Sequence, residues 1–432
     1  MNIIEELRWR GLIHEITPET EEHLKDHKVS VYLGVDPTGN SMHIGNLVPV
    51  MMLVNLQRAG HTPYALVGGA TGRVGDPSGK DKERQLLDEE TIDYNVSCIR
   101  KQLEHFLDFE GENAAIMVNN YDWFGKMGFL EFLRDVGKHL TVNYMMSKES
   151  VKKRMSGDQG ISYTEFAYQL LQGYDFYHLY QNEGVKMQVG GSDQWGNITT
   201  GTELIRRMTD GEAKAYAAVC PLMTREDGSK FGKTAEGNSV WLDAEKTSPY
   251  EFYQYWMNVG DSDAEKFIKI FTIKSREEIE ALVAEHQEAP HQRKLHQALA
   301  EDITERVHGK AGLAMAQKLT QFLFSRNTSP DALAELSADD WKQVVRNSPD
   351  TRQISRGKLE EGIGVLDLLT ELGICSSKGE ARRAIEKDRS VAINAAKCEA
   401  SDATLDLNTA FHGRYFQVQR GKKNRFLVEV VD

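Results

Sequence analysis

The feature that most constrains the fold of this chain is the alternation of strand-like and helix-like patterns over its first 247 residues. Several apolar segments end in glycine or an acidic residue just before a helical pattern begins. Such alternation favours a parallel sheet with crossover helices, whose functional site lies at the carboxyl ends of the strands. The five candidate strands are VSVYLGVD (29–36), HTPYALVGGA (61–70), AAIMVNN (114–120), VKMQVGG (185–191) and AYAAVCPLM (215–223).

The sequence changes character at Ser248 and again after residue 325. Four segments with amphipathic helical spacing follow one another over 248–325, which predicts a separate α-helical domain. Residues 326–352 mix short helical patterns with Pro, Ser and Asn, and they are expected to form a linker. Short helical and alternating strand patterns over 353–432 predict a small α+β domain.

A helical insertion is expected near residues 120–160, between the two halves of the sheet. The stretch FLEFLRDVGKHLTVNYMMSKESVKKRM (129–155) has helical periodicity and carries two adjacent methionines. It can pack within the domain, or it can form an interface between subunits. The residues alone leave both alternatives open.

Composition argues against several classes of protein. With 432 residues, 40% hydrophobic and 27% charged, the chain is expected to be a soluble protein of more than one domain. It has no apolar run of the roughly 18–20 residues that cross a bilayer, and its N-terminus lacks a signal-peptide core, so a cytoplasmic location is expected. The four cysteines form no C-x-x-C pair, which argues against zinc ligation and against a disulfide framework.

Charge is unevenly distributed along the chain. The net charge of −13 argues against attraction of RNA over the whole surface. Residues 351–432, however, hold 14 Lys and Arg against 12 Asp and Glu. This locally positive end can supply contacts to phosphates.

The segment YLGVDPTGNSMHIGN (32–46) carries the strongest local signal for chemistry. In an extended strand Tyr32, Gly34 and Asp36 share one face, because side chains alternate between the two faces. Pro37 ends the strand. The chain then enters IGNLVPVMMLVNLQ, which is apolar around most of its circumference, as a buried helix is.

His43 and Asn46 are therefore expected in the first turn of a helix that leaves the sheet. Unpaired N–H groups and the helix dipole favour phosphate at that position. Gly45 removes a side chain where a nucleotide could approach closely. The alternative for His43 is a purely structural role as a helix cap.

The glycine-rich segment GGATGRVGDPSGKDKERQ (68–85) is similar to a phosphate-binding loop but does not match the P-loop pattern. Gly75 and Gly79 are one residue too close, and Asp81 stands at the Ser/Thr position. A P-loop NTPase is therefore disfavoured, although a glycine-rich turn beside a nucleotide is consistent with the sequence. The basic residues at the end of the segment can meet phosphates or form a solvated charge run.

Three polar residues fall on one face of the helical segment TEFAYQLLQGYDFYHLY (164–180). At about 100° per residue, Tyr168, Gln172 and Asp175 lie within about 60° of arc. Leucines and aromatic residues cover much of the remaining surface. The stripe indicates buried polar recognition; the alternative is an ordinary amphipathic surface helix.

Two further segments carry weaker signals. VGGSDQWGN (189–197) is a strand that ends in two glycines followed by Asp193 and Gln194. An acidic residue there suits ribose hydroxyls, or it caps the next helix. DGSKFGKT (227–234) places two lysines three residues apart in a glycine-containing loop after the fifth strand.

Taken together and in this order, the five segments resemble the motifs of class I aminoacyl-tRNA synthetases, and in detail those of the bacterial tyrosyl enzymes. HIGN (43–46) resembles the His-Ile-Gly-His motif, and KFGKT (230–234) resembles the Lys-Met-Ser-Lys-Ser motif. Two further segments, GGSDQWGN (190–197) and TSPYEFYQ (247–254), are similar to sequences found in this family. The C-terminal segment resembles an S4-type RNA-binding domain, so the likeness covers nearly the whole chain.

The resemblance implies an α/β fold with a Rossmann-like parallel-sheet catalytic domain over 1–247. An α-helical domain over 248–325 would contact the anticodon region of the tRNA, and an S4-like α+β domain over 353–432 would bind RNA. The implied enzyme activates L-tyrosine with ATP, releases pyrophosphate, and transfers tyrosine to the 3′ end of tRNA(Tyr). A homodimer without membrane association is implied as well.

The same resemblance assigns roles to residues at the sheet edge. Tyr32 and Asp175 would hold the substrate phenol. The implied tyrosine-binding set is Tyr32, Asp76, Tyr168, Gln172, Asp175, Gln188 and Gln194. The implied ATP-binding set is Gly34, Asp36, His43, Gly45, Gly191, Asp193, Lys230 and Lys233.

The implied chemistry is in-line attack of the tyrosine carboxylate on the α-phosphate of ATP. That nucleophile is ionised near neutral pH, so positioning and electrostatic stabilisation carry the catalysis rather than a general base. Mg²⁺ would accompany the ATP, without a tightly bound metal ligated by the protein. The implied catalytic residues are Thr38, His43, Asn46, Lys80, Arg84, Lys230, Lys233 and Thr234, of which Asn46 stands where the motif has a second histidine.

Contacts to the tRNA are the remaining implication of the likeness. Three rival functions stay open at the level of sequence: a synthetase of the tryptophanyl type, an inactive RNA-binding or regulatory descendant of such an enzyme, and a P-loop NTPase. The Tyr32/Asp175 pair and the S4-like end argue against the first. The residues expected to meet RNA are Arg382, Arg383, Lys422, Lys423 and Arg425.

Overall fold

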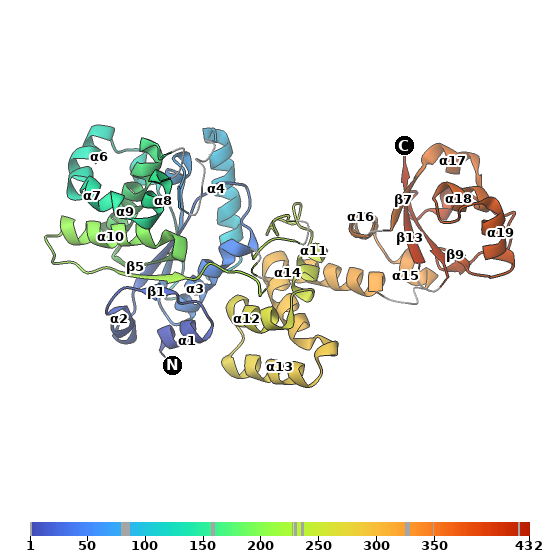
Figure 1. Ribbon diagram of the computed structural model, residues 1–432, viewed down its shortest axis with the longest axis horizontal. Coiled ribbons are helices and arrows are strands. Elements are labelled where there is room, and N and C mark those ends of the chain that lie inside the picture. Colours follow the sequence, from blue (N-terminus) through green and yellow to red (C-terminus); the bar gives the residue numbers. More distant parts are fainter. Residues whose placement is uncertain are drawn as a thin grey trace. The chain divides into compact units, whose positions relative to one another are not determined.

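The computed structural model divides the chain into two compact units, whose elements are labelled in Figure 1. The first unit comprises Met1–Thr247 and Gln254–Gly309, and the second comprises Ser248–Tyr253 and Lys310–Asp432. Each unit has a sheet and a hydrophobic core of its own. The structure describes residues 2–78, 87–156, 160–226, 228, 231–234, 237–324, 329–348, 350–421 and 424–432.

A six-stranded sheet forms the centre of the first unit, with the strand order β1-β6-β5-β2-β3-β4. Neighbouring strands from β2 to β6 are parallel, whereas β1 runs antiparallel to β6. The predicted parallel sheet is confirmed, and all five candidate strands are present. The strands are β1 (Glu15–Ile16), β2 (Ser30–Val35), β3 (Thr62–Val67), β4 (Ile116–Asn119), β5 (Val185–Gly191) and β6 (Tyr216–Cys220).

The chain builds this sheet outward from β2 in two directions. It places β3 and β4 on one side of β2, and it later returns to place β5 and β6 on the other side. Where the strand order reverses in this way, connections leave the sheet in opposite directions and a crevice opens at the carboxyl ends of the strands. The crevice between β2 and β5 positions the candidate site.

Helices bury the strands of this sheet. α3 (Leu47–Arg58) is buried at ten of its twelve residues, as its nearly continuous apolar pattern predicts. α9 (Tyr163–Glu183) and α10 (Trp195–Met208) pack closely because Gly173 and Gly201 let their backbones approach. The other helical segments near the sheet are α1 (Ile3–Trp9), α2 (Thr20–Asp26), α4 (Glu89–Leu103), η1 (Ile44–Asn46), η2 (Thr71–Arg73) and η4 (Ser192–Gln194).

The described residues between β4 and α9 form a group of short helical segments, in the stretch where a helical insertion is expected. Val136, Leu140 and Met145 from this group pack against Leu170 and Leu204, which belong to α9 and α10. The group is therefore attached to the sheet through the α9–α10 pair. Its members are α5 (Tyr121–Phe124), α6 (Phe129–Asp135), η3 (Gly137–His139), α7 (Val142–Met146) and α8 (Glu149–Met155).

Residues 254–309 form one compact unit with the sheet, whereas a separate domain over 248–325 was expected. One physical reason is the packing of α12 (Asp261–Phe271), a helix that was not predicted. The ring centroids of its Phe267 and Phe271 lie 4.8 and 5.4 Å from that of Phe231. α14 bends at Gly309, where a φ of 71° and a ψ of 175° suit glycine. The helices are α11 (Pro249–Met257), α12 (Asp261–Phe271), α13 (Arg276–Glu288), η5 (Pro290–Gln292) and α14 (Lys294–Phe324).

The second unit is a small α+β fold, as its sequence predicts. Its five-stranded sheet has the order β10-β9-β12-β13-β7, and β8 pairs with β11. β12 and β13 form an antiparallel hairpin, while β7 joins β13 in parallel. The strands are β7 (Thr351–Ser355), β8 (Ile363–Gly364), β9 (Val391–Ile393), β10 (Ala396–Lys397), β11 (Thr404–Leu405), β12 (Tyr415–Arg420) and β13 (Asn424–Val431).

Helices of the second unit pack against its sheet. The buried ring of Trp341 stacks on those of Phe411 and Tyr415, at centroid distances of 5.4 and 6.0 Å. α15 and α16 occupy part of the stretch expected to be a linker. Across the described parts of both units, no helix combines the length and the apolarity that a membrane span requires. The helices are α15 (Pro330–Ala334), α16 (Ala338–Asn347), α17 (Arg356–Glu361), α18 (Val365–Glu371), α19 (Lys378–Glu386) and η6 (Leu407–Thr409).

Candidate active site

A cavity of about 650 Å³ opens in the first unit at the carboxyl ends of β2, β5 and β6. It gathers residues that are widely separated in the sequence, from β2, η1, α9, β5 and the turns that follow these elements. Fifteen of the residues singled out by sequence line this one cavity: Tyr32, Gly34, Asp36, Thr38, His43, Gly45, Asn46, Asp76, Tyr168, Gln172, Asp175, Gln188, Gly191, Asp193 and Gln194.

The register of the sheet brings the first of these residues together. Tyr32 of β2 lies opposite Gln188 of β5, so their side chains are neighbours on one face of the sheet. Asp36 follows the last residue of β2 and therefore stands at the carboxyl edge. α9 crosses this edge and presents the predicted polar stripe to the cavity, since Tyr168, Gln172 and Asp175 all line it.

The closed end of the cavity pairs a phenol with a carboxyl group. Tyr32 is 1% exposed and Asp175 is 2% exposed. Asp175 accepts hydrogen bonds from Nδ2 of Asn120 at 3.0 Å and from Nε1 of Trp123 at 2.9 Å. Burial raises the pKa of Asp175 despite these two donors, and burial together with the Asp175 charge raises the pKa of Tyr32. Tyr32 is therefore a neutral hydrogen-bonding phenol at physiological pH.

Three buried polar atoms at this cavity have no hydrogen-bond partner within the described protein. They are Oη of Tyr32, Oε1 of Gln172 and Oε1 of Gln188. Buried polar atoms are usually paired, because an unmade hydrogen bond leaves the cost of desolvation uncompensated. Their convergence on one cavity indicates a site whose ligand supplies the missing partners.

The middle of the cavity is held rigid around Asp36. Its two carboxylate oxygens accept hydrogen bonds from Oη of Tyr168 at 2.7 Å and from Oγ1 of Thr71 at 2.6 Å. A Cβ at Gly68 would lie 2.1 Å from Oδ1 of Asp36, so glycine is required for this close approach. Burial, followed by the Asp36 charge, raises the pKa of Tyr168.

A second carboxylate, Asp76, is fixed on the loop after β3. It accepts hydrogen bonds from the Ser78 backbone N–H at 3.0 Å, from Nε2 of Gln194 at 2.6 Å and from Nδ2 of Asn197 at 3.3 Å. Gln194 also donates to Asp193 at 3.3 Å. Asp36, Asp76 and Asp193 are thus three carboxylates oriented by hydrogen bonds at this cavity, which suits a cationic or hydroxyl-rich ligand.

The HIGN segment forms a tight turn at the start of a helix, as predicted. The backbone N–H of Gly45 donates to Nδ1 of His43 at 3.1 Å, and Oδ1 of Asn46 accepts from the backbone N–H of His43 at 3.0 Å. The first of these bonds places the ring proton of neutral His43 on Nε2. The second occupies the oxygen of Asn46, so its amide nitrogen is the atom that can donate to a ligand.

The loop that follows β6 reaches the edge of this cavity, and its described lysine, Lys233, points to another partner. Phe231 lines the cavity, and a Cβ on Gly232 would lie 3.4 Å from Ile44. Nζ of Lys233 donates a hydrogen bond to Oγ of Ser239 at 2.9 Å. The backbone N–H of Thr234 donates to the backbone carbonyl of Asn238 at 2.7 Å. Neither Lys233 nor Thr234 lines the cavity. Lys80, Arg84 and Lys230 lie outside the described residues.

Comparison with known proteins decides between the families that share this fold. Residues 24–325 match the family described as tRNA synthetases class I (W and Y), and residues 342–428 match the tyrosine–tRNA ligase SYY-like C-terminal domain. A tyrosine–tRNA ligase of Bacteroides thetaiotaomicron is 54% identical over 433 residues, 99% of each chain. That of Cytophaga hutchinsonii is 54% identical over 431 residues, again 99% of each chain. The chain belongs to the tyrosine–tRNA ligase family.

A solved structure of this family supports the same conclusion. The C-terminally truncated mitochondrial tyrosyl-tRNA synthetase of Aspergillus nidulans is 30% identical, with a TM-score of 0.68. The match covers 75% of this chain and 94% of that chain. The family inferred from the sequence motifs and the fold class are therefore both confirmed.

Four residues that hold the carboxylates of this family member in place were missed by sequence reasoning. Asn120 and Trp123 hold Asp175, Thr71 holds Asp36, and Asn197 holds Asp76. Three of the four stand in segments already marked as informative: the end of the third candidate strand, the glycine-rich segment and the end of VGGSDQWGN. Nothing in the local sequence marks Trp123.

The basic residues expected to meet RNA belong to the second unit. Arg382 and Arg383 are exposed on α19. Arg425 is half-buried, because its guanidinium donates to the backbone carbonyl of Phe322 at 3.0 Å. Burial lowers the pKa of Arg425. Lys422 and Lys423 lie outside the described residues.

Proposed function

We propose that this tyrosine–tRNA ligase binds L-tyrosine and ATP in the cavity at the carboxyl ends of β2 and β5 and forms tyrosyl-adenylate there. Tyrosine is then transferred to the 3′ end of tRNA(Tyr). The observation that carries this proposal is the convergence of Oη of Tyr32, Oε1 of Gln172 and Oε1 of Gln188 on one cavity without protein partners in the described chain. Each of these atoms can pair with a polar group of tyrosine.

The closed end is assigned to the phenol of the substrate. The hydroxyl of Tyr32 can donate to the substrate oxygen, while the carboxyl group of Asp175 can accept the substrate proton. Asn120 and Trp123 hold Asp175 in position. A phenylalanine ring would seal both groups away from water without pairing them, and this unpaired burial supplies discrimination.

The ammonium group of tyrosine is assigned to the wall that carries Asp76, Tyr168 and Gln172. Asp76 contributes negative charge, and its hydrogen bonds to Gln194 and Asn197 fix that charge in place. Oε1 of Gln172 has no partner among the described groups and faces the cavity, so it can accept an N–H of the ammonium. Gln188 lines the same part of the site.

ATP is assigned to the side of the cavity where the HIGN turn begins a helix. Nε2 of His43 and the amide nitrogen of Asn46 can donate to phosphate oxygens, together with the hydroxyl of Thr38. Gly34, Gly45 and Gly191 leave space for the nucleotide along the sheet edge. Asp193 folds back against Gly191, where a Cβ would lie 2.5 Å from its Oδ1, and it is placed to accept from ribose hydroxyls.

The reaction needs orientation more than proton transfer. A carboxylate oxygen of tyrosine forms a bond to the α-phosphorus, the bond from that phosphorus to the bridging oxygen breaks, and pyrophosphate leaves with the electron pair. Charge that develops on the α-phosphate is stabilised by His43 and Thr38. We assign Lys80, Arg84, Lys230, Lys233 and Thr234 to the departing pyrophosphate, so Lys233 must exchange its hydrogen bond with Ser239 for one to a phosphate.

Mg²⁺ is proposed to enter with ATP as the counterion of its phosphates. The described carboxyl groups of the cavity, Asp36, Asp76, Asp175 and Asp193, already accept hydrogen bonds from protein groups and do not form an octahedral cage of oxygens. Phosphate oxygens and water would therefore supply most of the ligands. When bound with ATP, the ion would supply neutralisation of the phosphate charge.

The tRNA is proposed to contact the second unit through the exposed side of α19. Arg382 and Arg383 can pair with phosphates there, and Lys422 and Lys423 are assigned to the same role from sequence alone. Arg425 is expected to contribute less to RNA binding, because its guanidinium donates a hydrogen bond to the backbone carbonyl of Phe322. Since the substrate is a tRNA, we propose the cytoplasm as the compartment.

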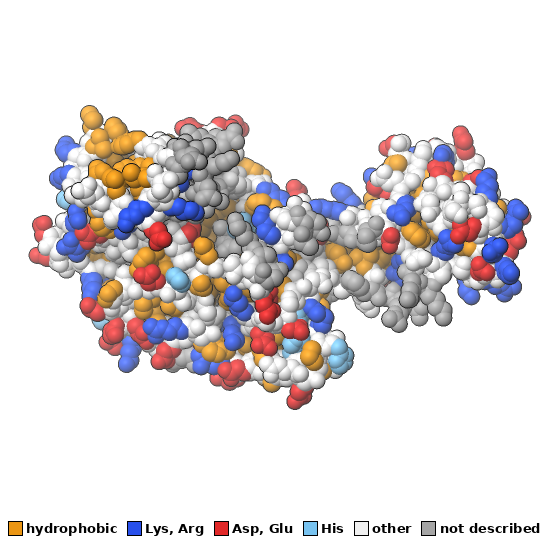
Figure 2. Space-filling model, viewed as in Figure 1, with side chains coloured by type: hydrophobic (Ala, Val, Ile, Leu, Met, Phe, Trp, Pro, Cys, Tyr) orange, Lys and Arg blue, Asp and Glu red, His pale blue; other side chains and the backbone are white. Residues whose placement is uncertain are grey.

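A homodimer is proposed through the exposed face of α6 and α7. Phe129 is 64% exposed, Leu130 is 79% exposed and Val142 is 58% exposed. Figure 2 shows hydrophobic side chains gathered over the α6 end of the first unit, at the upper left. Apolar patches of this kind commonly mark interfaces between chains.

Sedimentation of Leu130→Glu tests the dimer. A buried charge at the interface is expected to produce monomers, while Tyr94→Glu, at an exposed aromatic residue of α4, is expected to sediment like the wild-type chain. Equal sedimentation of both variants and the wild type as dimers would place the interface elsewhere.

The activity itself is tested by ATP–pyrophosphate exchange with each of the twenty amino acids in turn. We expect exchange that depends on L-tyrosine and is far slower with phenylalanine or tryptophan. Exchange driven by tryptophan, or ATP hydrolysis that needs no amino acid, would contradict the proposed function.

A further inference from the structure

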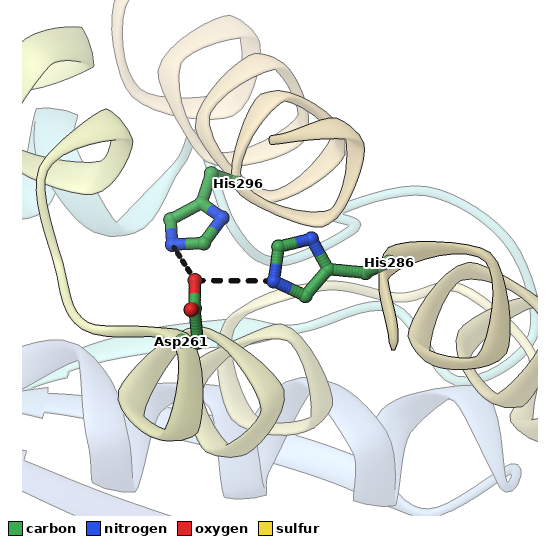
Figure 3. A group of neighbouring side chains, drawn as sticks. All are labelled: Asp261, His286 and His296. Atoms are coloured by element: carbon green, nitrogen blue, oxygen red, sulfur yellow. Dashed lines mark hydrogen bonds and ion pairs between the residues drawn. The ribbon is translucent and has the colours of Figure 1, made fainter. Parts of the chain in front are cut away.

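Three side chains outside the active-site cavity converge on one point of the first unit. Asp261 is the first residue of α12, His286 lies near the end of α13, and His296 lies in the first turn of α14. Figure 3 shows Nε2 of both rings directed at the carboxylate of Asp261. Both histidines are buried, whereas Asp261 is 59% exposed.

The distances from Asp261 to the two histidines match those between ligands of one metal ion. Oδ1 of Asp261 lies 3.1 Å from Nε2 of His286 and 3.5 Å from Nε2 of His296, and all three atoms lie within 4.8 Å of one another. Two ligands of a tetrahedral Zn²⁺, each about 2.05 Å from the metal, are about 3.3 Å apart. Two imidazoles and one carboxylate form a donor set that suits Zn²⁺ and related transition metals, and suits Mg²⁺ or Ca²⁺ poorly.

We propose that Asp261, His286 and His296 form a binding site for one Zn²⁺ or a similar transition-metal ion. The two Nε2 atoms and one carboxylate oxygen are the protein ligands. Because Asp261 is largely exposed, solvent reaches the group, and water completes the coordination. The site shares no residue with the cavity assigned to tyrosine and ATP, so this inference does not depend on the proposed function.

The surroundings of the group set the expected strength of binding. The carbonyl oxygen of Val259 lies 3.1 Å from Nε2 of His296, so this ring must give up a hydrogen bond and move its proton to Nδ1 when it binds a metal. Nδ1 of His286 and of His296 have no hydrogen-bond partner in the described protein. Outer hydrogen bonds strengthen metal sites by roughly 10–100-fold each, so affinity in the micromolar rather than the nanomolar range is expected.

An ion at this position would tie together α12, α13 and α14. α12 is also the helix whose Phe267 and Phe271 pack against Phe231, in the loop that carries Lys233. The backbone carbonyls of Lys269 in α12 and of Thr272 directly after it accept hydrogen bonds from Arg10. The expected consequence of binding is therefore a more stable first unit, which can be measured without any substrate.

The test uses the full-length protein after removal of metals by a chelator. Equilibrium dialysis against micromolar Zn²⁺ should give one equivalent bound at this site, and Zn²⁺ should raise the unfolding temperature. Asp261→Asn keeps a hydrogen-bond acceptor for both rings but removes the anionic ligand. We expect it to fold like the wild type in chelator, to lose at least tenfold in Zn²⁺ affinity, and to lose the Zn²⁺-induced rise in unfolding temperature.

Two further variants keep the test decisive if one of them fails to fold. His286→Gln should also lose the bound equivalent. His291→Ala removes an exposed histidine of η5 between the two ligand histidines, and it should bind like the wild type. Absence of saturable binding to the wild type, or equal binding to Asp261→Asn and the wild type, would overturn the proposal and leave the group as hydrogen bonds between three helices.

Discussion

At the scale of single residues, the closed end of the cavity depends on burying a carboxyl group beside a phenol. Burial raises the pKa of Asp175 well above its usual value of 3.8, while the hydrogen bonds from Asn120 and Trp123 act in the opposite direction. The folded protein therefore holds the proton of Asp175 more tightly than the unfolded chain does. Its contribution to stability is complete below the unfolded pKa and is lost as pH rises through the folded pKa.

Asp175→Asn removes this titration and leaves a neutral side chain of the same shape. Relative to the variant, the wild type should lose up to about 1.4 kcal/mol in free energy of unfolding per pH unit as pH rises above 4 toward the folded pKa. The measurement is the unfolding midpoint of both proteins over that pH range. Asp122→Asn, at an exposed carboxylate nearby in the sequence, should run parallel to the wild type. If the unfolding midpoint of Asp175→Asn also changes with pH in parallel with that of the wild type, the proposed effect of burying Asp175 is contradicted.

At the scale of elements, the contact between α9 and α10 supports the same end of the cavity. A Cβ on Gly201 of α10 would lie 2.9 Å from Cδ1 of Phe176 and 3.0 Å from its Cβ. The Phe176 ring in turn meets Tyr32 edge to face, at 5.2 Å between centroids. Gly201→Ala should therefore displace Phe176, destabilise the protein by about 1–3 kcal/mol, and weaken tyrosine binding.

Gly196→Ala is the matched control on the same helix. A Cβ there would meet its nearest neighbour at 3.8 Å, so the change should be neutral or stabilising by up to about 1 kcal/mol. Thermal unfolding and equilibrium binding of tyrosine compare the two variants. Similar effects of both substitutions would show that the close approach at Gly201 does not set the shape of the cavity.

The sequence predicted those elements whose pattern is strong and local. The five parallel strands, the buried helix α3 and the polar stripe of α9 all follow from periodicity in short windows. The edge strands β1 and β7 were missed, because one has two residues and the other, TRQIS, is largely polar. α12 was missed although Phe267, Ile268 and Phe271 are spaced as on one helical face, because the segment begins with GDSD (260–263), a composition typical of a loop.

The site was predictable to the extent that its residues belong to recognisable motifs. Asn120 and Trp123 were missed because their importance comes from hydrogen bonds to a residue more than 50 positions away in the chain. Only the assembled fold reveals such a pairing. The group of Asp261, His286 and His296 was also missed, because its members come together only when three helices pack. It contains no cysteine, so the spacing of cysteines does not indicate it.

At the scale of the whole molecule, the two compact units carry different parts of the proposed function. The second unit has its own core, in which Leu319 and Trp341 belong to the same cluster as Tyr415 and Leu427. A cut within Lys310–Asp432 would divide that core, so the chosen truncation removes the whole of Lys310–Asp432 and leaves only the short segment Ser248–Tyr253 of the second unit. The cavity assigned to tyrosine and ATP lies entirely within the remaining first unit.

The truncated chain should keep tyrosine-dependent ATP–pyrophosphate exchange with an unchanged KM for tyrosine. Charging of tRNA should fall by at least about tenfold, because phosphate contacts of the second unit are lost. Parallel assays of exchange and aminoacylation, with circular dichroism to confirm folding, give the answer. A folded truncation that loses exchange, or that keeps full charging, would contradict this division.

The proposed recognition of the substrate phenol by the phenol of Tyr32 is tested by the kcat/KM of Tyr32→Phe for tyrosine and for phenylalanine. For tyrosine we expect a fall of about tenfold, which corresponds to one lost hydrogen bond of about 1.4 kcal/mol. For phenylalanine we expect no fall, because the unpaired hydroxyl is removed. Equal changes for the two amino acids, or an unchanged value for tyrosine, would contradict it.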